Sequence, residues 1–390
     1  MKKTILVGSL GLLATSAVPA VAADTPEVKL SWGGYIKLDT LYSRFSDGAV
    51  AQGTGRDTYI PNQIPVVANN LEDKRSYLDF HAKETRLFLK AETLVEGHKL
   101  GGHIEFDFIV NQGAGSETST NAYNPGLRRA FITFDNWLFG QEWSTFQNLT
   151  ALPESLDFVA FPTDGTVFVR QPMVRYTHGG LMVALENPET TVATNGGGPA
   201  YANTDESNVL PDLVLRYNFK AGAADLTVAA LARQLVDKGA VDGASDKATG
   251  FGGTFSGKLP LGETDDLRFM VSGGDGIGRY LALNTVGDAV VDANADLNTL
   301  RVINGYVALH HGWDAKTRSN LGLSHLDANT DNGDLGGNAT QKVSSAFVNL
   351  LYSPVSKLTV GVEYRYAQRE TVSGLDGDLN RLQFSAKYSF

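Results

Sequence analysis

The segment LRRAFITFDNWLFGQEW, residues 127–143, decides the fold because it contains two strands and the turn that joins them. In its first half, Ala130, Ile132 and Phe134 share one face of an extended chain, and Arg129 lies on the other. This two-residue period predicts a half-buried β-strand. An Asp-Asn pair then reverses the chain, and a second strand runs back. The segment therefore predicts an antiparallel hairpin.

The connection that follows, Ser144–Val167, is unusually apolar for a loop. Pro153, Pro162 and Gly165 bend it, and the strand Arg170–Tyr176 returns from it. Its apolar side chains are Phe146, Leu149, Leu152, Leu156, Phe158, Val159 and Phe161. Because surface loops are usually polar and solvated, we expect this segment to fold into a barrel and to set the width of a pore. The alternative is a surface loop over a small satellite core.

Two-residue alternation recurs along the rest of the chain, as in His103–Ile109, where Ile104, Phe106 and Phe108 share a face. From this pattern we predict sixteen strands: 33–43, 82–93, 99–110, 127–135, 136–143, 169–178, 180–187, 211–220, 224–235, 248–259, 265–274, 301–312, 315–326, 343–353, 358–369 and 379–390.

Short and long connections alternate between these strands. The long ones are rich in Gly, Asn, Asp and Thr, and aromatic residues such as Trp137, Trp313 and Tyr352 gather near the short ones. An even strand number, short turns at one end, long loops at the other and an aromatic girdle are typical of outer-membrane proteins. The pattern therefore predicts an all-β, antiparallel, up-and-down transmembrane β-barrel. The strands of a soluble sandwich or propeller would also show two-residue alternation. Such a fold would not need short and long connections to alternate along the whole chain.

The first residues read as a signal peptide, Met1–Ala23, with Lys2 and Lys3 before an apolar stretch and small residues at its end. We expect it to be cleaved, which leaves one barrel domain, 24–390, exported to the outer membrane of a Gram-negative cell. The chain has no cysteine, which excludes disulfides and thiol chemistry. Its net charge of −10 lacks the basic excess of a nucleic-acid binder, so we expect no nucleic-acid partner.

No pattern in the sequence indicates an enzyme, a cofactor or a metal. The adjacent His310 and His311 face opposite sides of a strand, and no nucleophile elbow or zinc-binding helix motif occurs. His103 shares a face with two carboxylates, which leaves a catalytic site as an alternative to a polar lumen residue. Asp327–Asp334 has the alternating oxygen ligands that begin a calcium loop, but it lacks the glycine and glutamate that complete one. A solvated external loop is the preferred interpretation.

Several segments together resemble the DcaP-like family of trimeric outer-membrane porins. They are Gly33–Asp39, Thr85–Leu87, Asn136–Phe146 with its GQEWSTF run, Arg170–Thr177 and Gly274–Tyr280. The resemblance covers nearly the whole mature chain. It implies a sixteen-stranded homotrimer that passes small anionic nutrients, dicarboxylates among them. Some members of the family carry a helical stretch before the barrel, and the short segment 24–32 leaves no room for one.

The polar face of each strand should line the lumen. We therefore expect the constriction to be formed by residues of the strands beside the loop and of the loop itself: Lys37, Arg86, Arg129, Arg170, Arg175, Asp157 and Asp164. Arg170 is the least certain of these residues. The two-residue alternation places its side chain on the face opposite that of Arg175, so it reaches the lumen only if the strand bulges. Among the charged side chains assigned to the lumen, basic residues slightly outnumber acidic ones, although the chain as a whole is acidic. Charges at a narrow site are screened less than those on external loops, so we predict a passive, anion-preferring channel for small hydrophilic solutes.

Two alternatives remain at this point: a general porin with little charge preference, and an outer-membrane enzyme or adhesin. The chain also ends in an apolar, alternating strand that contains Tyr388 and Phe390. This strand looks like the C-terminal signal that the barrel assembly machinery recognises. Such recognition would occur by strand addition to an open edge. The expected partners are thus outer-membrane lipid, two further copies of the chain, the assembly machinery and small anionic solutes.

Overall fold

The structure is a computed structural model, and it describes residues 27–67, 74–109, 119–158, 163–193, 202–203, 210–238, 245–294, 296–329 and 334–390. The expected signal peptide, Met1–Ala23, lies outside the described residues. No helix among the described residues is both long enough and apolar enough to cross a membrane.

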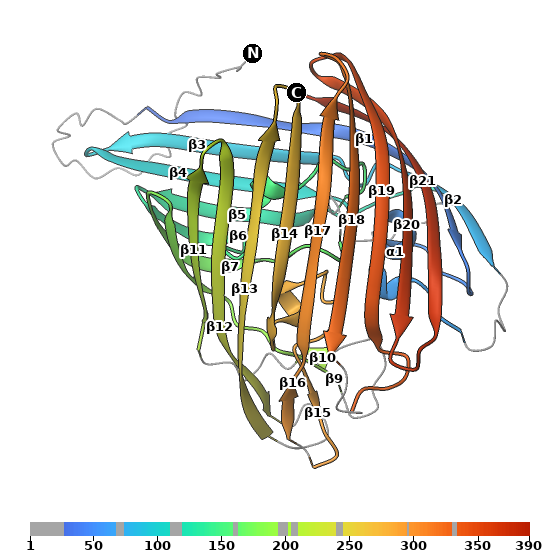
Figure 1. The fold of residues 1–390 in the computed structure, drawn as a ribbon. Helices are drawn as coiled ribbons and strands as arrows, with labels where there is room; N and C mark the ends of the chain where they lie inside the picture. The colour runs from blue at the N-terminus through green and yellow to red at the C-terminus, as the bar shows by residue number, and fades with distance from the viewer. Residues whose placement is uncertain are drawn as a thin grey trace.

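Antiparallel strands form the wall of a closed barrel (Figure 1). They are β1 (Lys29–Phe45), β2 (Arg75–His81), β3 (Arg86–Val95), β4 (His98–Asp107), β5 (Gly126–Phe134), β6 (Trp137–Trp143), β7 (Arg170–His178), β8 (Leu181–Glu186), β11 (Asp212–Ala221), β12 (Ala224–Lys238), β13 (Ser245–Leu261), β14 (Asp265–Asp275), β17 (Arg301–Gly312), β18 (Thr317–Asn329), β19 (Thr340–Val355), β20 (Leu358–Thr371) and β21 (Asp376–Ser389).

The sixteen-stranded antiparallel barrel predicted from the alternation is confirmed. β2 and β3 both pair with β1, along successive halves of it, so together they fill one position in the wall. β21 pairs with β1 from Tyr35↔Ser389 to Phe45↔Leu379, which closes the barrel and removes the sheet edges. The short turns lie at the end of the barrel where the chain terminates, and the long connections lie at the other (Figure 1).

The second wall position differs from the predicted strand 82–93. Its first half is β2, in a segment that the sequence assigned to a long loop, and residues 82–85 interrupt the ladder. Lys83 and Glu84 in the interruption are buried; Lys83 pairs with Asp57 and Glu84 with Lys37. The strand breaks because these two neighbouring charges both turn to partners inside the barrel, which regular alternation does not allow.

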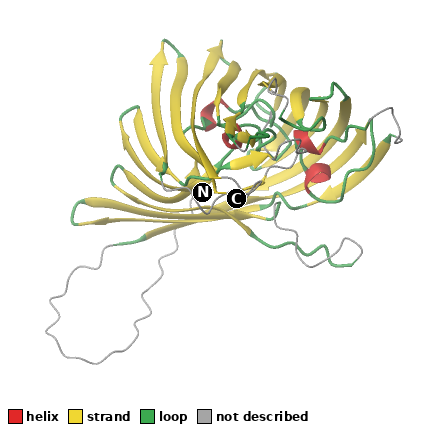
Figure 2. Cartoon of the chain, turned by 90° about the horizontal axis from the view of Figure 1, so that it is seen from below, coloured by secondary structure: helices red, strands yellow, loops and turns green. Residues whose placement is uncertain are grey.

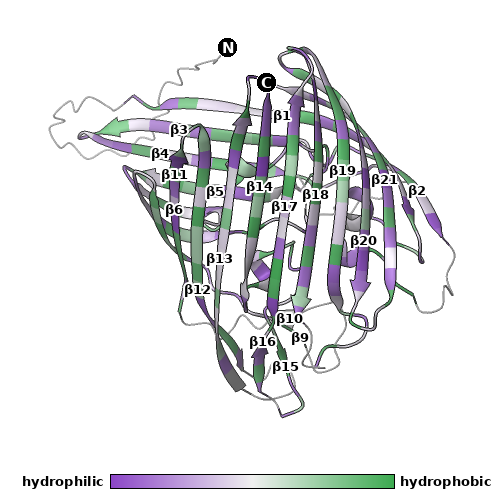
Figure 3. Ribbon diagram, in the orientation of Figure 1, coloured by the Kyte–Doolittle hydropathy of each residue, from purple (hydrophilic) through white to green (hydrophobic). Residues whose placement is uncertain are grey.

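Apolar and polar residues alternate along the wall strands (Figure 3), and the large apolar side chains exposed on the strands contrast with many buried polar ones. On β18, Leu321 and Leu323 are about half exposed on the outer face, whereas Asn320 and Ser324 are buried on the inner face. This is the inverse of a soluble protein, and it matches a wall that faces hydrocarbon outside and water inside.

Short elements occupy the connections at the long-loop end. A helix, α1 (Thr54–Asp57), and a 3₁₀ turn, η1 (Pro61–Gln63), follow β1. The connections after β8 and β14 contribute a four-stranded sheet with the order β10-β9-β15-β16 and a 3₁₀ turn, η5. These elements are β9 (Thr191–Ala193), β10 (Ala202–Asn203), β15 (Ala289–Val291), β16 (Leu297–Thr299) and η5 (Gly278–Tyr280).

The connection between β6 and β7 folds into the barrel, as the sequence predicted. Seen along the barrel, it and the neighbouring loops lie within the ring of strands (Figure 2). Phe146 and Val167 near its two ends are fully buried, in one cluster with Tyr280, Tyr306 and Phe347. The apolar core of the molecule is therefore inside the barrel, between this loop and the wall.

Candidate pore constriction

Of the inward loop, the structure describes residues 144–158 and 163–169, and residues 147–156 contact successive parts of the inner wall from β11 to β1. The first part of the loop accepts a hydrogen bond from Arg216 of β11 to the Gln147 carbonyl, at 2.5 Å. Asn148 then donates to Thr227 of β12 at 3.1 Å and to Ser256 of β13 at 3.0 Å. The 3₁₀ turn η3 (Leu149–Ala151) comes next, with Asn148 as its cap.

The middle of the loop continues along the same wall. Tyr306 of β17 donates to the Ala151 carbonyl at 2.8 Å, and Arg268 of β14 donates to the next carbonyl at 2.5 Å. Glu154 takes two hydrogen bonds from Arg318 of β18, both at 2.6 Å. Backbone groups of a loop in the lumen need such partners, because few neighbours in the chain satisfy them.

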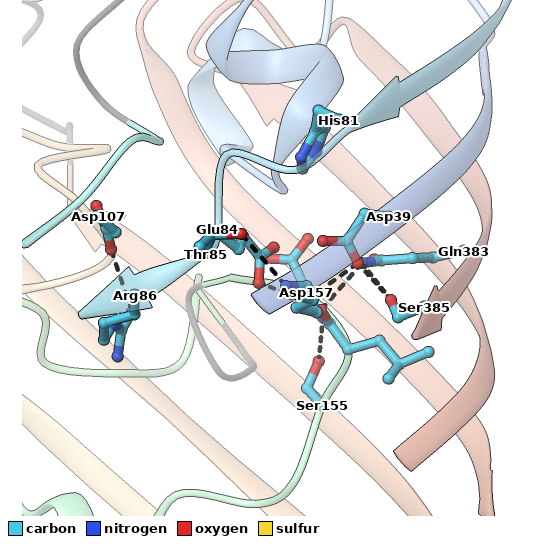
Figure 4. Close-up of polar contacts among 12 residues, drawn as sticks. Asp39, His81, Glu84, Thr85, Arg86, Asp107, Ser155, Asp157, Gln383 and Ser385 are labelled. Carbon is cyan, nitrogen blue, oxygen red and sulfur yellow. Dashed lines mark hydrogen bonds and ion pairs between the residues drawn. The ribbon is translucent and has the colours of Figure 1, made fainter. Parts of the chain in front are cut away.

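The tip of the loop reaches the last strands. Glu363 of β20 accepts hydrogen bonds from the Leu156 amide at 2.8 Å and from the Ser155 hydroxyl at 3.0 Å. Lys37 of β1 and Gln383 of β21 both donate to the Leu156 carbonyl, at 2.5 and 2.9 Å (Figure 4). The strands from β11 through β21 to β1 thus carry the loop, and we call them the loop-bearing wall.

The Glu154–Arg318 pair is the most exposed of these anchors, and Glu154 lies on the loop itself. Its side chain is 34% exposed and that of Arg318 is 24% exposed. Burial raises the pKa of the Glu154 carboxyl, but the hydrogen bonds and charge of Arg318 outweigh burial and hold the pKa below its ordinary value of 4.5. Glu154 is therefore ionised at neutral pH, and it keeps the loop on β18.

Two of the predicted constriction residues, Asp157 and Asp164, are buried at contacts of this loop. Asp157 accepts a hydrogen bond from the Tyr59 amide at 2.9 Å, and its carboxylate lies 3.8 Å from Arg381. Asp164 accepts hydrogen bonds from Ser324 and Ser345 at 2.5 and 2.8 Å. Both carboxylates therefore hold the loop in place, and Asp157 also lines a cavity beside the loop tip.

Lys37 likewise holds the loop. Its ammonium group pairs with Glu84 and lies 3.1 Å from Asp39, in addition to its bond to Leu156. The side chain is 7% exposed, and its charge is compensated by the carboxylates of Glu84 and Asp39. Between this group and the loop tip lies a cavity of about 160 Å³, which Tyr35, Arg86 and Lys387 also line.

The strands β3–β8, which we call the arginine wall, carry the other predicted residues. Arg86 lies 3.2 Å from Asp107, and Arg129 holds Glu142 through two nitrogens, at 2.7 and 2.5 Å. Arg129 also approaches Glu105 at 3.5 Å. About a fifth to a quarter of the Arg86 and Arg129 side chains is exposed, so both pairs face accessible space.

Arg128 also belongs to this cluster, and the alternation did not reveal it. The β4–β5 register shifts between Glu105 and Phe106, so β5 bulges at Arg128 and turns two successive side chains inward. Arg128 donates to Glu105 at 2.9 Å and to Asp107 at 2.5 Å, and it is buried. Two adjacent arginines near the start of a strand were the available signal for a bulge.

Arg170 and Arg175 of β7 differ from these three arginines. Within the described residues neither guanidinium group makes a direct hydrogen bond or ion pair, although Arg175 interacts electrostatically with Glu142 and Glu186. The Arg170 guanidinium lies 5.1 Å from the ring centre of Trp143, and it interacts electrostatically with Arg128 and Asp107. The Arg170 side chain therefore lies near Arg128 and Asp107, although the two-residue alternation places it on the other face of the strand from Arg175. The arginine wall holds charge that its carboxylates do not pair directly.

No group of three or more His, Asp or Glu side chains that could hold a metal occurs among the described residues. In the candidate calcium loop, residues 330–333 are outside the described part, and Asp327 lies in β18, opposite Lys342 of β19. The terminal Phe390 packs on Trp32 with ring centres 5.6 Å apart, and its amide donates to the Gly34 carbonyl at 3.1 Å.

A sixteen-stranded barrel with an apolar exterior, a polar interior and a loop held inside it defines an outer-membrane porin. Within that class, the model of the DcaP outer membrane protein family matches residues 14–390, and the chain belongs to this family. It therefore resides in the outer membrane.

Solved structures agree with this assignment. The outer membrane channel DcaP of Acinetobacter baumannii is 26% identical, with a TM-score of 0.75 over 93% of this chain and 97% of that one. OmpT of Vibrio cholerae is 12% identical, with a TM-score of 0.55 over 94% and 99%. Salmonella typhi OmpF, in a complex with daunomycin, is 11% identical, with a TM-score of 0.52 over 92% and 97%. The last two likenesses show the fold alone. Comparison with curated protein sequences gives no match.

Proposed function

We propose that the protein is a passive diffusion channel for small hydrophilic anions, with dicarboxylates as preferred solutes, and that it catalyses no reaction. The observation that carries this proposal is that the guanidinium groups of Arg170 and Arg175, on the arginine wall, make no direct hydrogen bond or ion pair with a carboxylate of the described residues. Arginine stays charged at any relevant pH and binds carboxylates through two nitrogens. Arg86 and Arg129, each paired with a carboxylate and about a fifth to a quarter exposed, border the same surface. A dicarboxylate could then contact two arginines at once.

The test is blockade of single-channel current in a planar bilayer by a small dicarboxylate such as succinate. We expect millimolar succinate to reduce the chloride current of the unmodified channel and to act much more weakly on Arg175→Gln. Arg301→Gln is the matched control, because Arg301 is 60% exposed at the long-loop end of β17 and pairs with Asp275. Current without blockade would favour a general porin. The lack of any stable current would favour a barrel enzyme or an adhesin.

We further propose that the channel is a homotrimer. OmpT of Vibrio cholerae has a trimer form among the similar structures. The outer face of the arginine wall exposes Leu94, Ile132 and Phe139, and such a face could pack against another copy. Chemical cross-linking of the protein in outer-membrane vesicles should give a three-chain product, and a monomer alone would contradict this proposal.

The C-terminal strand is proposed as the assembly signal, with Tyr388 and Phe390 as its aromatic residues. β21 closes the barrel on β1, so its edge is available for strand addition until that pairing forms. Deletion of Phe390 should lower the amount of heat-modifiable barrel recovered from the outer membrane. A normal amount would show that the machinery does not read this residue.

A further inference from the structure

A polar cavity of about 400 Å³ lies at the long-loop end of β1, β20 and β21. Tyr42, Arg44, Lys74, Tyr364 and Asn380 are among its lining residues. On β1 and β20, Tyr42 and Tyr364 belong to the half-exposed outer face, opposite in parity to buried Leu41 and Glu363. The cavity is therefore on the outside of the barrel, at the end that faces the outer leaflet of the membrane.

The cavity is rich in hydrogen-bond donors. Arg44 and Lys74 are exposed, and neither side chain makes an ion pair or hydrogen bond within the part of the chain that the structure describes. Asn380 accepts a hydrogen bond from the Tyr364 hydroxyl at 2.7 Å through its oxygen, which leaves the amide nitrogen free to donate. Asp378 also lines the cavity, and its carboxylate accepts a hydrogen bond from the Tyr366 hydroxyl at 2.6 Å.

An apolar groove of about 480 Å³ continues from this cavity along the same strands. Its walls are Leu38, Leu350, Tyr352, Val362 and Phe384, and the small side chains Thr40 and Ala386 form part of its lining.

The strand register joins the two hollows. Tyr42 and Tyr364 of the cavity both pair with Leu382, and two residues further along the strands Thr40 and Val362 both pair with Phe384. From Tyr42 to Leu38 the strand rises roughly 13 Å. A ligand with a polar head and a long apolar chain could therefore occupy the cavity and the groove together.

We propose that this track binds one molecule of the phosphorylated glycolipid of the outer leaflet. A phosphate accepts hydrogen bonds from Arg44, Lys74 and Asn380, and an acyl chain lies in the groove below. The charges support this occupant: a chain with a net charge of −10 presents two cations where its apolar outer face ends. Basic groups at that height attract anionic headgroups, and arginine forms two parallel hydrogen bonds with a phosphate.

The test uses the full-length, folded protein in detergent and native mass spectrometry with purified lipid A as the probe. We expect one lipid A per chain, and at least tenfold weaker binding by the double variant Arg44→Gln/Lys74→Gln. Thr40→Trp, which fills the groove and leaves the cations intact, should weaken binding as well. Arg301→Gln, which removes an outer-surface arginine from another strand, should bind like the unmodified protein. Heat modifiability and unchanged conductance confirm that each variant is folded, because none of these residues lines the pore.

Three further measurements separate this occupant from others. Dephosphorylated lipid A should bind at least tenfold more weakly, and equal binding would overturn the role of the phosphate. Inorganic phosphate alone should not compete at the concentration of lipid A, and full competition would make the site a free-phosphate site. A cysteine at Tyr42 that cross-links two chains in the membrane would show that a second copy covers this face. Unchanged lipid A binding by the double variant would also overturn the proposal.

Discussion

The two sides of the barrel interior use their polar residues in different ways. The loop-bearing wall, β11 through β21 and β1, directs its arginines, asparagines and glutamates at the backbone of the inward loop, and these contacts are buried or partly buried. The arginine wall, β3–β8, pairs Arg86, Arg128 and Arg129 directly with carboxylates, whereas Arg170 and Arg175 interact with the carboxylates of the described residues only at longer range. The comparison teaches that inward polarity alone does not identify a solute site. A charge already bound to the protein supports the structure, and a charge without a direct partner is available to a solute.

Glu363 should show the strongest structural effect. Glu363→Ala removes the acceptor of the Ser155 hydroxyl, the Leu156 amide and Arg365, all at 3.0 Å or less. Loss of one partner from a buried ion pair costs about 3 kcal/mol, so the melting temperature should fall, and the released loop tip should raise the single-channel conductance. Glu370→Ala on the same strand is the control, because its pair with Lys342 is exposed. Unchanged conductance in the destabilised variant would mean that the loop tip does not limit the pore.

Arg128 tests the other wall. Arg128→Gln leaves Glu105 and Asp107 with Arg86 and Arg129 as remaining partners, so the loss of stability should be smaller, about 2 kcal/mol. Removing a positive charge should also reduce anion preference, as measured by the reversal potential. If Arg128→Gln lowers the melting temperature and leaves the reversal potential unchanged, Arg128 belongs functionally with the buried anchors.

Acid should loosen the loop slightly through Glu154. Its pKa in the folded protein is lowered below 4.5, so its contribution is fully present above that pH and is lost as the pH falls through the lowered pKa. Conductance should therefore rise as the pH is lowered below about 4.5, and the rise should be smaller in Glu154→Gln, which has no charge to lose. Identical pH profiles for the two proteins would assign the acid response to other carboxylates.

The sequence predicted the barrel because its two signals, alternation and connection length, are local. The inward loop was also predictable, because Phe146 and Leu156 are apolar in a segment that a surface loop would make polar. Contacts between distant segments were not predictable. The partners of Asp157 and Asp164, which are Tyr59, Ser324 and Ser345, could not be foreseen because they are more than ninety residues away in the chain. Alternation also cannot reveal a break in its own period, so it missed the bulge at Arg128 and the interruption at 82–85.

The proposed lipid site on the outer wall and the proposed ion preference of the lumen should be independent, because Arg44 and Arg175 lie on opposite faces of the barrel wall. The outer-wall variants should change lipid retention and leave selectivity as it is, whereas lumen variants should do the reverse. Purified channels with and without bound lipid A, compared in one bilayer system, would show whether the two sides are coupled.

The central claim is that Arg170 and Arg175 of the arginine wall set the ion preference, against the negative charge of the chain as a whole. Reversal potential in a potassium chloride gradient tests it most directly, on the unmodified channel, on Arg170→Glu/Arg175→Glu and on the surface control Arg301→Glu. The account predicts chloride preference in the unmodified channel and in the control, and potassium preference in the double variant. Potassium preference in the unmodified channel, or the same reversal potential in all three proteins, would contradict it.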